Sequence, residues 1–238
     1  MSRFQIFPDA EATARAAAER FVAAAERAIS VRGRFSVALS GGNTPLPTYR
    51  LLASEFAEQV DWSKTQIFWV DERCVPPAHE ASNYGAARRE LLVYLPIPPD
   101  NIYRMEGELP PKVAAESYIR TLDAYFGHKR RLDLVLLGMG TDAHTASLFP
   151  GDDALRSIMP VTVVPREDGI TRLTLTAATI NEAREICFLV SGAEKADILW
   201  EVHHSAPDPL KYPAQLIHPV DGQLVWLLDE AAANYVDA

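Results

Sequence analysis

The sequence predicts an α/β fold: a mostly parallel sheet with helices on both faces. Short apolar segments typical of strands alternate with amphipathic segments typical of helices along nearly all 238 residues. The connections are short, and residues 132–137 form an almost continuous apolar run, as expected of a strand covered on both faces. Because no linker or internal repeat interrupts the pattern, we expect a single domain over residues 1–238.

The expected helices share capping residues or apolar positions spaced by three and four. Asp9 can cap the first helix, which runs to about Ser30 before Gly33 breaks it. The others are expected after Pro45, from Ser82 through Leu92, over residues 112–126, after Thr141 or Asp142, and over residues 193–203.

The expected strands are short and apolar or alternate in polarity. They cover residues 35–40, 66–70, 132–137, 172–176, 185–191 and 223–228. Ligands of open α/β sheets bind at the carboxyl ends of strands. Polar clusters follow four of these strands, at residues 40–44, 71–73, 138–144 and 191–195, and their convergence predicts an active site.

Composition narrows the class of partner. The formal net charge is −9, which disfavours nucleic acid and anionic membrane surfaces as partners, because both need a basic face. The N-terminal segment does not resemble a signal peptide, and no apolar run approaches membrane length. Cys74 and Cys187 are interpreted as buried free thiols. We expect a cytoplasmic protein and leave its oligomeric state open, a monomer included.

The loop over residues 40–45 has the composition of a phosphate cradle. Gly41 and Gly42 let backbone N–H groups approach an anion, Thr44 can cap the next helix, and Pro45 suits its first turn. The loop matches neither a Walker motif nor a dinucleotide fingerprint. Taken alone, it is equally well interpreted as a tight strand-to-helix turn.

His144 is the candidate general base. A neutral imidazole can take a proton from water, and the N-terminus of a following helix would favour the neutral form. Asp142 could orient the ring, cap the helix, or do both. No metal-ligand spacing or serine-hydrolase elbow occurs, so we expect neither a metal site nor a serine triad.

Two further cations have open roles. Lys195 lies near a predicted helix start, where the helix dipole disfavours a cation by about 0.3–1 kcal/mol unless an anion is near. Arg172 opens a predicted strand. Each is either a ligand of a bound anion or a solvated surface residue.

Together these motifs resemble the 6-phosphogluconolactonase family. The matching stretches are SGGNTP at residues 40–45, DERCVP at 71–76 with Ser82 and Asn83, LGMGTDAHTASLFPG at 137–151, RLTLT at 172–176, SGAEKA at 191–196, and PAQLIHP at 213–219 with Trp226 and Asp229. They span nearly the whole chain, and the match at residues 137–151 is the most specific.

The resemblance implies a Rossmann-like fold shared with glucosamine-6-phosphate deaminases. It also implies hydrolysis of 6-phosphogluconolactone in the pentose phosphate pathway, without metal or cofactor. The small-molecule partner would be this phosphosugar lactone. It suggests catalytic roles for His144, Asp142 and Arg73. It places the substrate against Ser40, Gly41, Gly42, Asn43, Thr44, Asp71, Arg172 and Lys195.

Two local features bear on this assignment. The family usually has glycine where this chain has Ala143, and a left-handed conformation there would cost alanine about 1–2 kcal/mol. The related deaminases carry a glutamate five residues after the equivalent of His144, whereas this chain has Phe149. The alternatives are a deaminase-isomerase and a non-catalytic sugar-phosphate sensor. Such sensors generally carry an attached DNA-binding domain, and we expect none here because the predicted α/β domain takes up the 238 residues.

Overall fold

The computed structural model describes residues 3–127 and 129–235. Its main sheet has six strands in the order β1-β9-β8-β5-β2-β3, and every neighbouring pair is parallel. These strands are β1 (Arg3–Phe7), β2 (Phe35–Leu39), β3 (Thr65–Trp69), β5 (Leu134–Gly138), β8 (Glu185–Val190) and β9 (Gln223–Asp229). The predicted α/β class with a mostly parallel sheet is confirmed.

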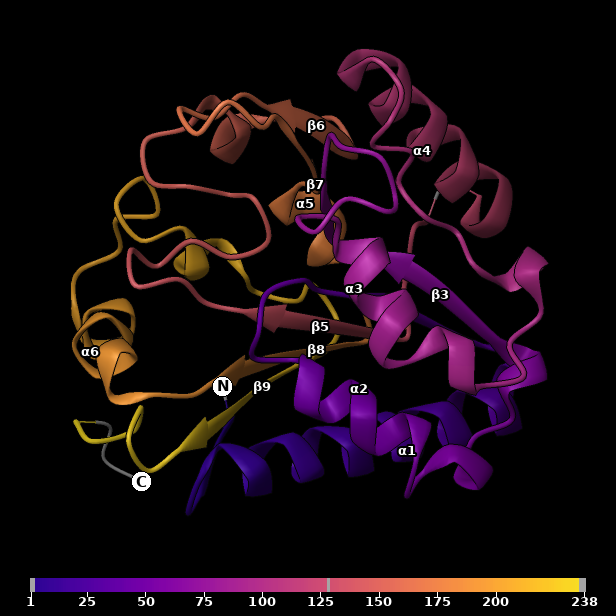
Figure 1. The fold of residues 1–238 in the computed structure, drawn as a ribbon. Coiled ribbons are helices and arrows are strands. Elements are labelled where there is room, and N and C mark those ends of the chain that lie inside the picture. Colours follow the sequence, from indigo (N-terminus) through magenta and orange to yellow (C-terminus); the bar gives the residue numbers. More distant parts are fainter. Residues whose placement is uncertain (1–2, 128, 236–238) are drawn as a thin grey trace.

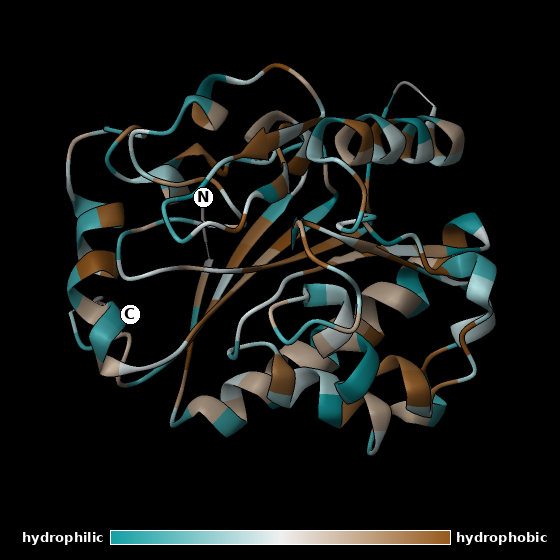
Figure 2. Cartoon of the chain, turned by 45° about the horizontal axis from the view of Figure 1, so that its top comes forward, coloured by the Kyte–Doolittle hydropathy of each residue, from teal (hydrophilic) through white to brown (hydrophobic). Residues whose placement is uncertain are grey.

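Helices cover both faces of this sheet (Figure 1). One face carries α1 (Ala10–Arg32), α2 (Leu46–Ala53) and α3 (Asn83–Glu90). The other carries α4 (Pro111–Phe126), the short α5 (Ala177–Ile180) and α6 (Ala196–His204). Alternate residues of the central strands enter the two cores: Val37 and Leu134 face α1, and Ala38 and Val135 face α4. Both faces are therefore apolar, and the strands form the brown centre of Figure 2.

A second, smaller sheet departs from the predicted pattern. It consists of β4 (Asp71–Arg73), β7 (Arg172–Leu175) and β6 (Val161–Val164) in the antiparallel order β4-β7-β6. The sequence predicted β7 but neither β4 nor β6, and it missed β1 and α5 as well. Each of these four segments is short, and none is an uninterrupted apolar run such as the one that indicates β5.

The ends of α1 follow from local sequence. The Asp9 carboxylate accepts the N–H of Ala12 at 2.8 Å, and Gly33, at φ 74°, ends the helix by donating to the carbonyl of Ile29. Both expectations are confirmed.

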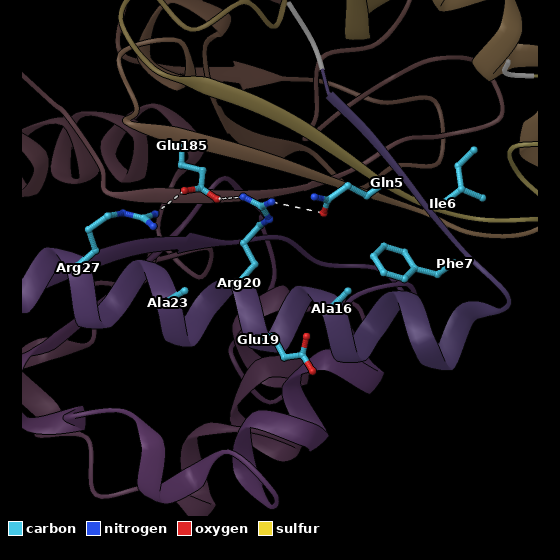
Figure 3. A pocket seen from close by; sticks show the side chains of 9 residues that line it. All are labelled: Gln5, Ile6, Phe7, Ala16, Glu19, Arg20, Ala23, Arg27 and Glu185. Carbon is cyan, nitrogen blue, oxygen red and sulfur yellow. Dashed lines mark hydrogen bonds and ion pairs between the residues drawn. The ribbon is translucent and has the colours of Figure 1, made fainter. Parts of the chain in front are cut away.

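A buried carboxylate fastens α1 to the sheet. Glu185 at the start of β8 accepts from Arg20 at 2.6 Å and from Arg27 at 2.7 Å, both on α1 (Figure 3). Its side chain is only 4% exposed, and both of its carboxylate oxygens have a cationic partner. No sequence pattern indicates this triad, because Glu185 lies more than 150 residues from both arginines.

Candidate active site

The order of the strands creates the site. From β2 the chain proceeds to β3 on one side, and it later returns to place β5 on the other side of β2. The loops that leave the carboxyl ends of β2 and β5 therefore separate, and a crevice between them is where such sheets bind ligands. The loop after β2 is the predicted cradle, and the loop after β5 contains His144.

The cradle loop is held by α2 rather than by its own side chains. The hydroxyl of the buried Tyr49 donates to the carbonyl of Ser40 at 2.7 Å, and Gly42 has a φ of 81°, a conformation that favours glycine. The expected cap by Thr44 is wrong: α2 begins after Pro45, which cannot provide a side-chain hydrogen bond. Pro45 is the N-cap residue and not part of the first turn as expected; the proline in that turn is Pro47.

Gly41 is required by its neighbour Asn83. A Cβ at residue 41 would lie 1.8 Å from the Asn83 Oδ1 atom. The Asn83 amide donates to the carbonyl of Asp71 at 2.9 Å and to its carboxylate at 3.0 Å. Ser147 donates to the other carboxylate oxygen of Asp71 at 2.6 Å. Asp71 is thus a fixed acceptor that links the cradle to the segment after His144.

Glu72 joins β4 to the N-terminus of α3. Its carboxylate accepts the backbone N–H groups of Arg73, Asn83 and Tyr84 at 2.7–2.8 Å, and the hydroxyl of Ser82 at 3.0 Å. Burial raises the pKa of Glu72 even against these donors. Ser82 itself caps α3, as predicted. The sequence predicted the cap by Ser82 but not the buried Glu72 carboxylate that binds the same helix end.

Arg73 lies at the cavity wall. One of its Nη atoms donates to the carbonyl of Ala81 at 2.6 Å, while its buried Nε has no hydrogen-bond partner among the described residues. The guanidinium is therefore anchored at one end and keeps donor capacity for a ligand.

His144 is oriented by Asp142. The Nδ1 atom of the ring lies 2.6 Å from the Asp142 Oδ1 atom, which also accepts the backbone N–H of His144 at 3.1 Å. Burial would raise the pKa of Asp142, but its hydrogen bonds with His144 and the interaction with the ring outweigh burial and lower that pKa to about 2. An ionised carboxylate only accepts, so Nδ1 carries a proton, and in the neutral ring the lone pair is on Nε2.

The segment after Asp142 is a series of turns, and the expected helix is absent from it. Ala143 and Ala146 have positive φ values of 65° and 48°, which an α-helix does not accommodate. Neither Thr141 nor Asp142 therefore caps a helix, and the N-terminal helix dipole that was expected to favour neutral His144 is absent from this segment. The expected strain at Ala143 is present, since this buried alanine is left-handed.

An aromatic ring and a cation pack beside His144. The Phe149 ring centroid lies 4.6 Å from that of His144, and the Arg166 guanidinium lies 3.7 Å from the Phe149 centroid. The position that holds glutamate in the related deaminases is therefore an apolar wall against the imidazole.

These parts enclose a cavity of about 350 Å³, which falls in the range of small-ligand sites. Of the residues predicted for the site, nine line it: Ser40, Gly41, Gly42, Asn43, Thr44, Asp71, Arg73, His144 and Lys195. Asp142 lies behind the ring of His144. Arg172 is not among the lining residues; it pairs with Asp168 at 2.6 Å. The roles assigned to all of these residues remain predictions.

Sequence reasoning gave no role to several residues that line the cavity. They are Asn83, Met139, Ala146, Ser191 and Glu194. Ser191 and Glu194 precede Lys195 after β8, within the polar cluster at residues 191–195 that was expected at that strand end, although neither was given a role of its own. Asn83 opens α3 and reaches the cavity only because Glu72 holds that helix, which no local pattern reveals. Among the described residues, no group of three or more His, Cys, Asp or Glu side chains is arranged to hold a metal ion.

The fold and site define an α/β protein with a ligand cavity at a switch point, combining a glycine-rich loop, two cations and an oriented histidine. A family model described as glucosamine-6-phosphate isomerases/6-phosphogluconolactonase matches residues 8–226. The chain belongs to this family. It is 40% identical over 233 residues to a 6-phosphogluconolactonase of Nostoc sp., covering 96% of this chain and 95% of the relative. It is 43% identical to that of Synechocystis sp., covering 87% of each.

Solved structures agree with the fold. A 6-phosphogluconolactonase from Trypanosoma brucei superposes with a TM-score of 0.87 at 28% identity, covering 100% of this chain and 99% of that one. A monomeric glucosamine-6-phosphate deaminase superposes with a TM-score of 0.85 at 19% identity, covering 98% and 99%. The second likeness concerns the fold alone, and it confirms the predicted similarity to the deaminase fold.

Proposed function

We propose that the protein hydrolyses 6-phospho-D-glucono-1,5-lactone to 6-phosphogluconate in the oxidative pentose phosphate pathway. The observation that carries this proposal is the pairing of Asp142 with His144, whose ring lines the same cavity as the glycine-rich loop. The relatives named 6-phosphogluconolactonase support the same reaction. The substrate is a small phosphorylated molecule and the reaction needs no cofactor. We also propose a cytoplasmic location. No helix in the described part of the chain is long and apolar enough to cross a membrane.

The mechanism uses the free nitrogen of His144. The loop over residues 40–44 and Lys195 hold the phosphate, so that its binding energy orients the lactone carbonyl. The Nε2 atom takes a proton from water, and the resulting hydroxide attacks C1. Arg73 stabilises the oxyanion of the tetrahedral intermediate. The bond between C1 and the ring oxygen then breaks, and the imidazolium returns the proton to that oxygen.

Asp142 assists without exchanging the proton. Its carboxylate fixes the tautomer and stabilises the imidazolium that forms during the reaction. Phe149 favours this chemistry over deamination, because its ring covers the side of His144 where a second carboxylate would be needed.

The test is the decay of lactone generated in situ, followed with wild type, His144→Ala and no protein. Loss of a general base costs about 10²–10⁴ in rate, so the variant should approach the spontaneous rate while still binding phosphate ligands. His218→Ala is the matched control, because His218 is exposed and lies outside the residues lining the cavity. Near-normal turnover by His144→Ala would exclude this base. Turnover of glucosamine 6-phosphate in place of the lactone would favour the deaminase.

A further inference from the structure

A second cavity lies at the opposite end of the sheet from the active site. It has a volume of about 340 Å³ and opens at the amino ends of β2, β5 and β8, which are neighbours in the sheet. Five cationic side chains line it: Arg32, Arg34, Lys129, Arg131 and Arg184. They come from three separate connections of a chain with a net charge of −9, so their convergence runs against the overall charge.

The carboxylates near this cluster do not balance it. Asp133 pairs with Arg32 at 2.8 Å and lies 3.3 Å from Arg184, and Asp221 pairs with Arg131 at 3.1 Å. Within the described part of the chain, no carboxylate is within ion-pair distance of the other two cations. Five positive charges thus face two negative ones. The cavity beside Glu185 is different, since both of its arginines are paired with that buried carboxylate (Figure 3).

One donor group inside the cluster is left over. The buried Nε atom of Arg131 has no hydrogen-bond partner among the described residues, whereas the Nε atom of Arg184 lies 3.3 Å from the Asp133 carboxylate. Burial and the charges of Arg32 and Arg131 lower the pKa of Arg184, which shows how closely the cations crowd one another. An unpaired buried donor and mutual repulsion both disfavour this arrangement unless an anion occupies it.

Two of the exposed cations, Arg32 and Arg34, are positioned by neighbouring side chains. The Asp133 carboxylate accepts the backbone N–H and the hydroxyl of Ser36 at 2.9 and 3.0 Å, so it is a fixed anchor for Arg32. The Arg34 guanidinium lies 4.4 Å from the ring centroid of Tyr125. Such a preorganised set of guanidinium groups is suited to phosphate, which accepts their paired N–H donors.

We propose that this cluster is a second binding site, specific for a small polyvalent anion of the phosphate class. The cavity is large enough for a pyrophosphate or a phosphorylated metabolite, and its concave shape favours such a ligand over an extended acidic segment. The site is independent of the lactone chemistry, because it shares no lining residue with the active-site cavity.

The test is a titration of the full-length protein with pyrophosphate, followed by amide chemical shifts. Amides of Ser36 and Arg184 report this site, and those of Gly41 and Gly42 report the active site. The double variant Arg34→Gln/Lys129→Gln removes the two cations that have no carboxylate partner, so the internal ion pairs survive. We expect pyrophosphate affinity at the second site to fall by about tenfold or more, with lactone turnover unchanged.

Arg88→Gln/Lys112→Gln is the matched control, since it removes two exposed cations on α3 and α4. Parallel titrations with inorganic phosphate and 6-phosphogluconate distinguish an inorganic from an organic source. No shift at Ser36 and Arg184 at millimolar pyrophosphate, or equal weakening in the two double variants, would overturn the proposal. Binding of a hexaglutamate peptide but none of the phosphates would also overturn it, and would assign the cluster to an acidic protein segment.

Discussion

Adding one methyl group at Gly140 should disable His144 without altering any reacting group. A Cβ at this position would lie 2.0 Å from the Nδ1 atom and 2.2 Å from the Cε1 atom of His144, and 2.6 Å from the Asp142 carboxylate. Ordinary contact begins at 3.4 Å, so the ring must retreat by more than an ångström. The hydrogen bond of 2.6 Å between His144 and Asp142 cannot survive that movement.

The size of the effect follows from this displacement. A misplacement of about 1 Å can cost 10²-fold in rate, and complete loss of a general base costs about 10²–10⁴. Gly140→Ala should therefore lower kcat by about 10²–10⁴, which is roughly 3–5 kcal/mol in the activation barrier. Gly140 does not have positive φ, so the alanine backbone is unstrained and the protein should still fold.

The assay is decay of in situ generated lactone at saturating and limiting concentrations, which separates kcat from KM. Because the cradle belongs to the loop after β2, KM should change far less than kcat. The same substitution in a His144→Ala background should have little further effect, since the ring that it displaces is gone. A Gly140→Ala enzyme with wild-type kcat, or an equally large loss in the His144→Ala background, would refute the reasoning.

Three other expectations concern stability. Ala143→Gly should retain activity and change the unfolding free energy by less than about 1 kcal/mol. The substitution relieves left-handed strain, but it also removes a buried methyl group and makes the unfolded chain more flexible. A large loss of activity in a folded variant would contradict this. Gly41→Ala should displace the Asn83 amide and lower the unfolding free energy, measured by urea denaturation, by about 1–3 kcal/mol. In the double variant Gly41→Ala/Asn83→Ala the added methyl group should be tolerated, because the clashing amide is gone. Burial, aided by the charge of His204, lowers the pKa of His203 from 6.5 to about 4, so the unfolded chain binds a proton that the native protein does not as pH falls from 6.5 towards 4. Unfolding free energy should drop by about 2 kcal/mol between pH 7 and pH 5, and His203→Phe should remove that part of the pH dependence.

The elements predicted from the sequence are those with a repeating pattern. The buried strands β2, β3, β5, β8 and β9 and the long helices lie within a few residues of their predicted positions. β4 could not be predicted, because its three polar residues gain their partners from β7, about a hundred residues later.

The residues of the candidate site likewise fall into a part that the sequence predicts and a part that it does not. The cradle and His144 stand at strand ends that the sequence marks, so their convergence could be predicted. The turns after Asp142 could not, because alanine ordinarily favours a helix and the left-handed backbone of Ala143 is set by its surroundings. Arg172 illustrates the limit for single residues, since its pairing with Asp168 depends on a turn whose geometry the sequence does not specify.

The pairing of β1 with β9 sets an order for biosynthesis. Arg3 lies beside Val225 in the sheet, and β1 has its only strand partner of the described sheet in β9. A nascent chain therefore exposes β1 on the ribosome long before the strand that receives it has been made. The edge of the sheet can close only after β9 has been synthesised, whereas β2, β3 and β5 can associate earlier. Premature termination before β9 would leave both β1 and β8 with unpaired edges, which favour aggregation.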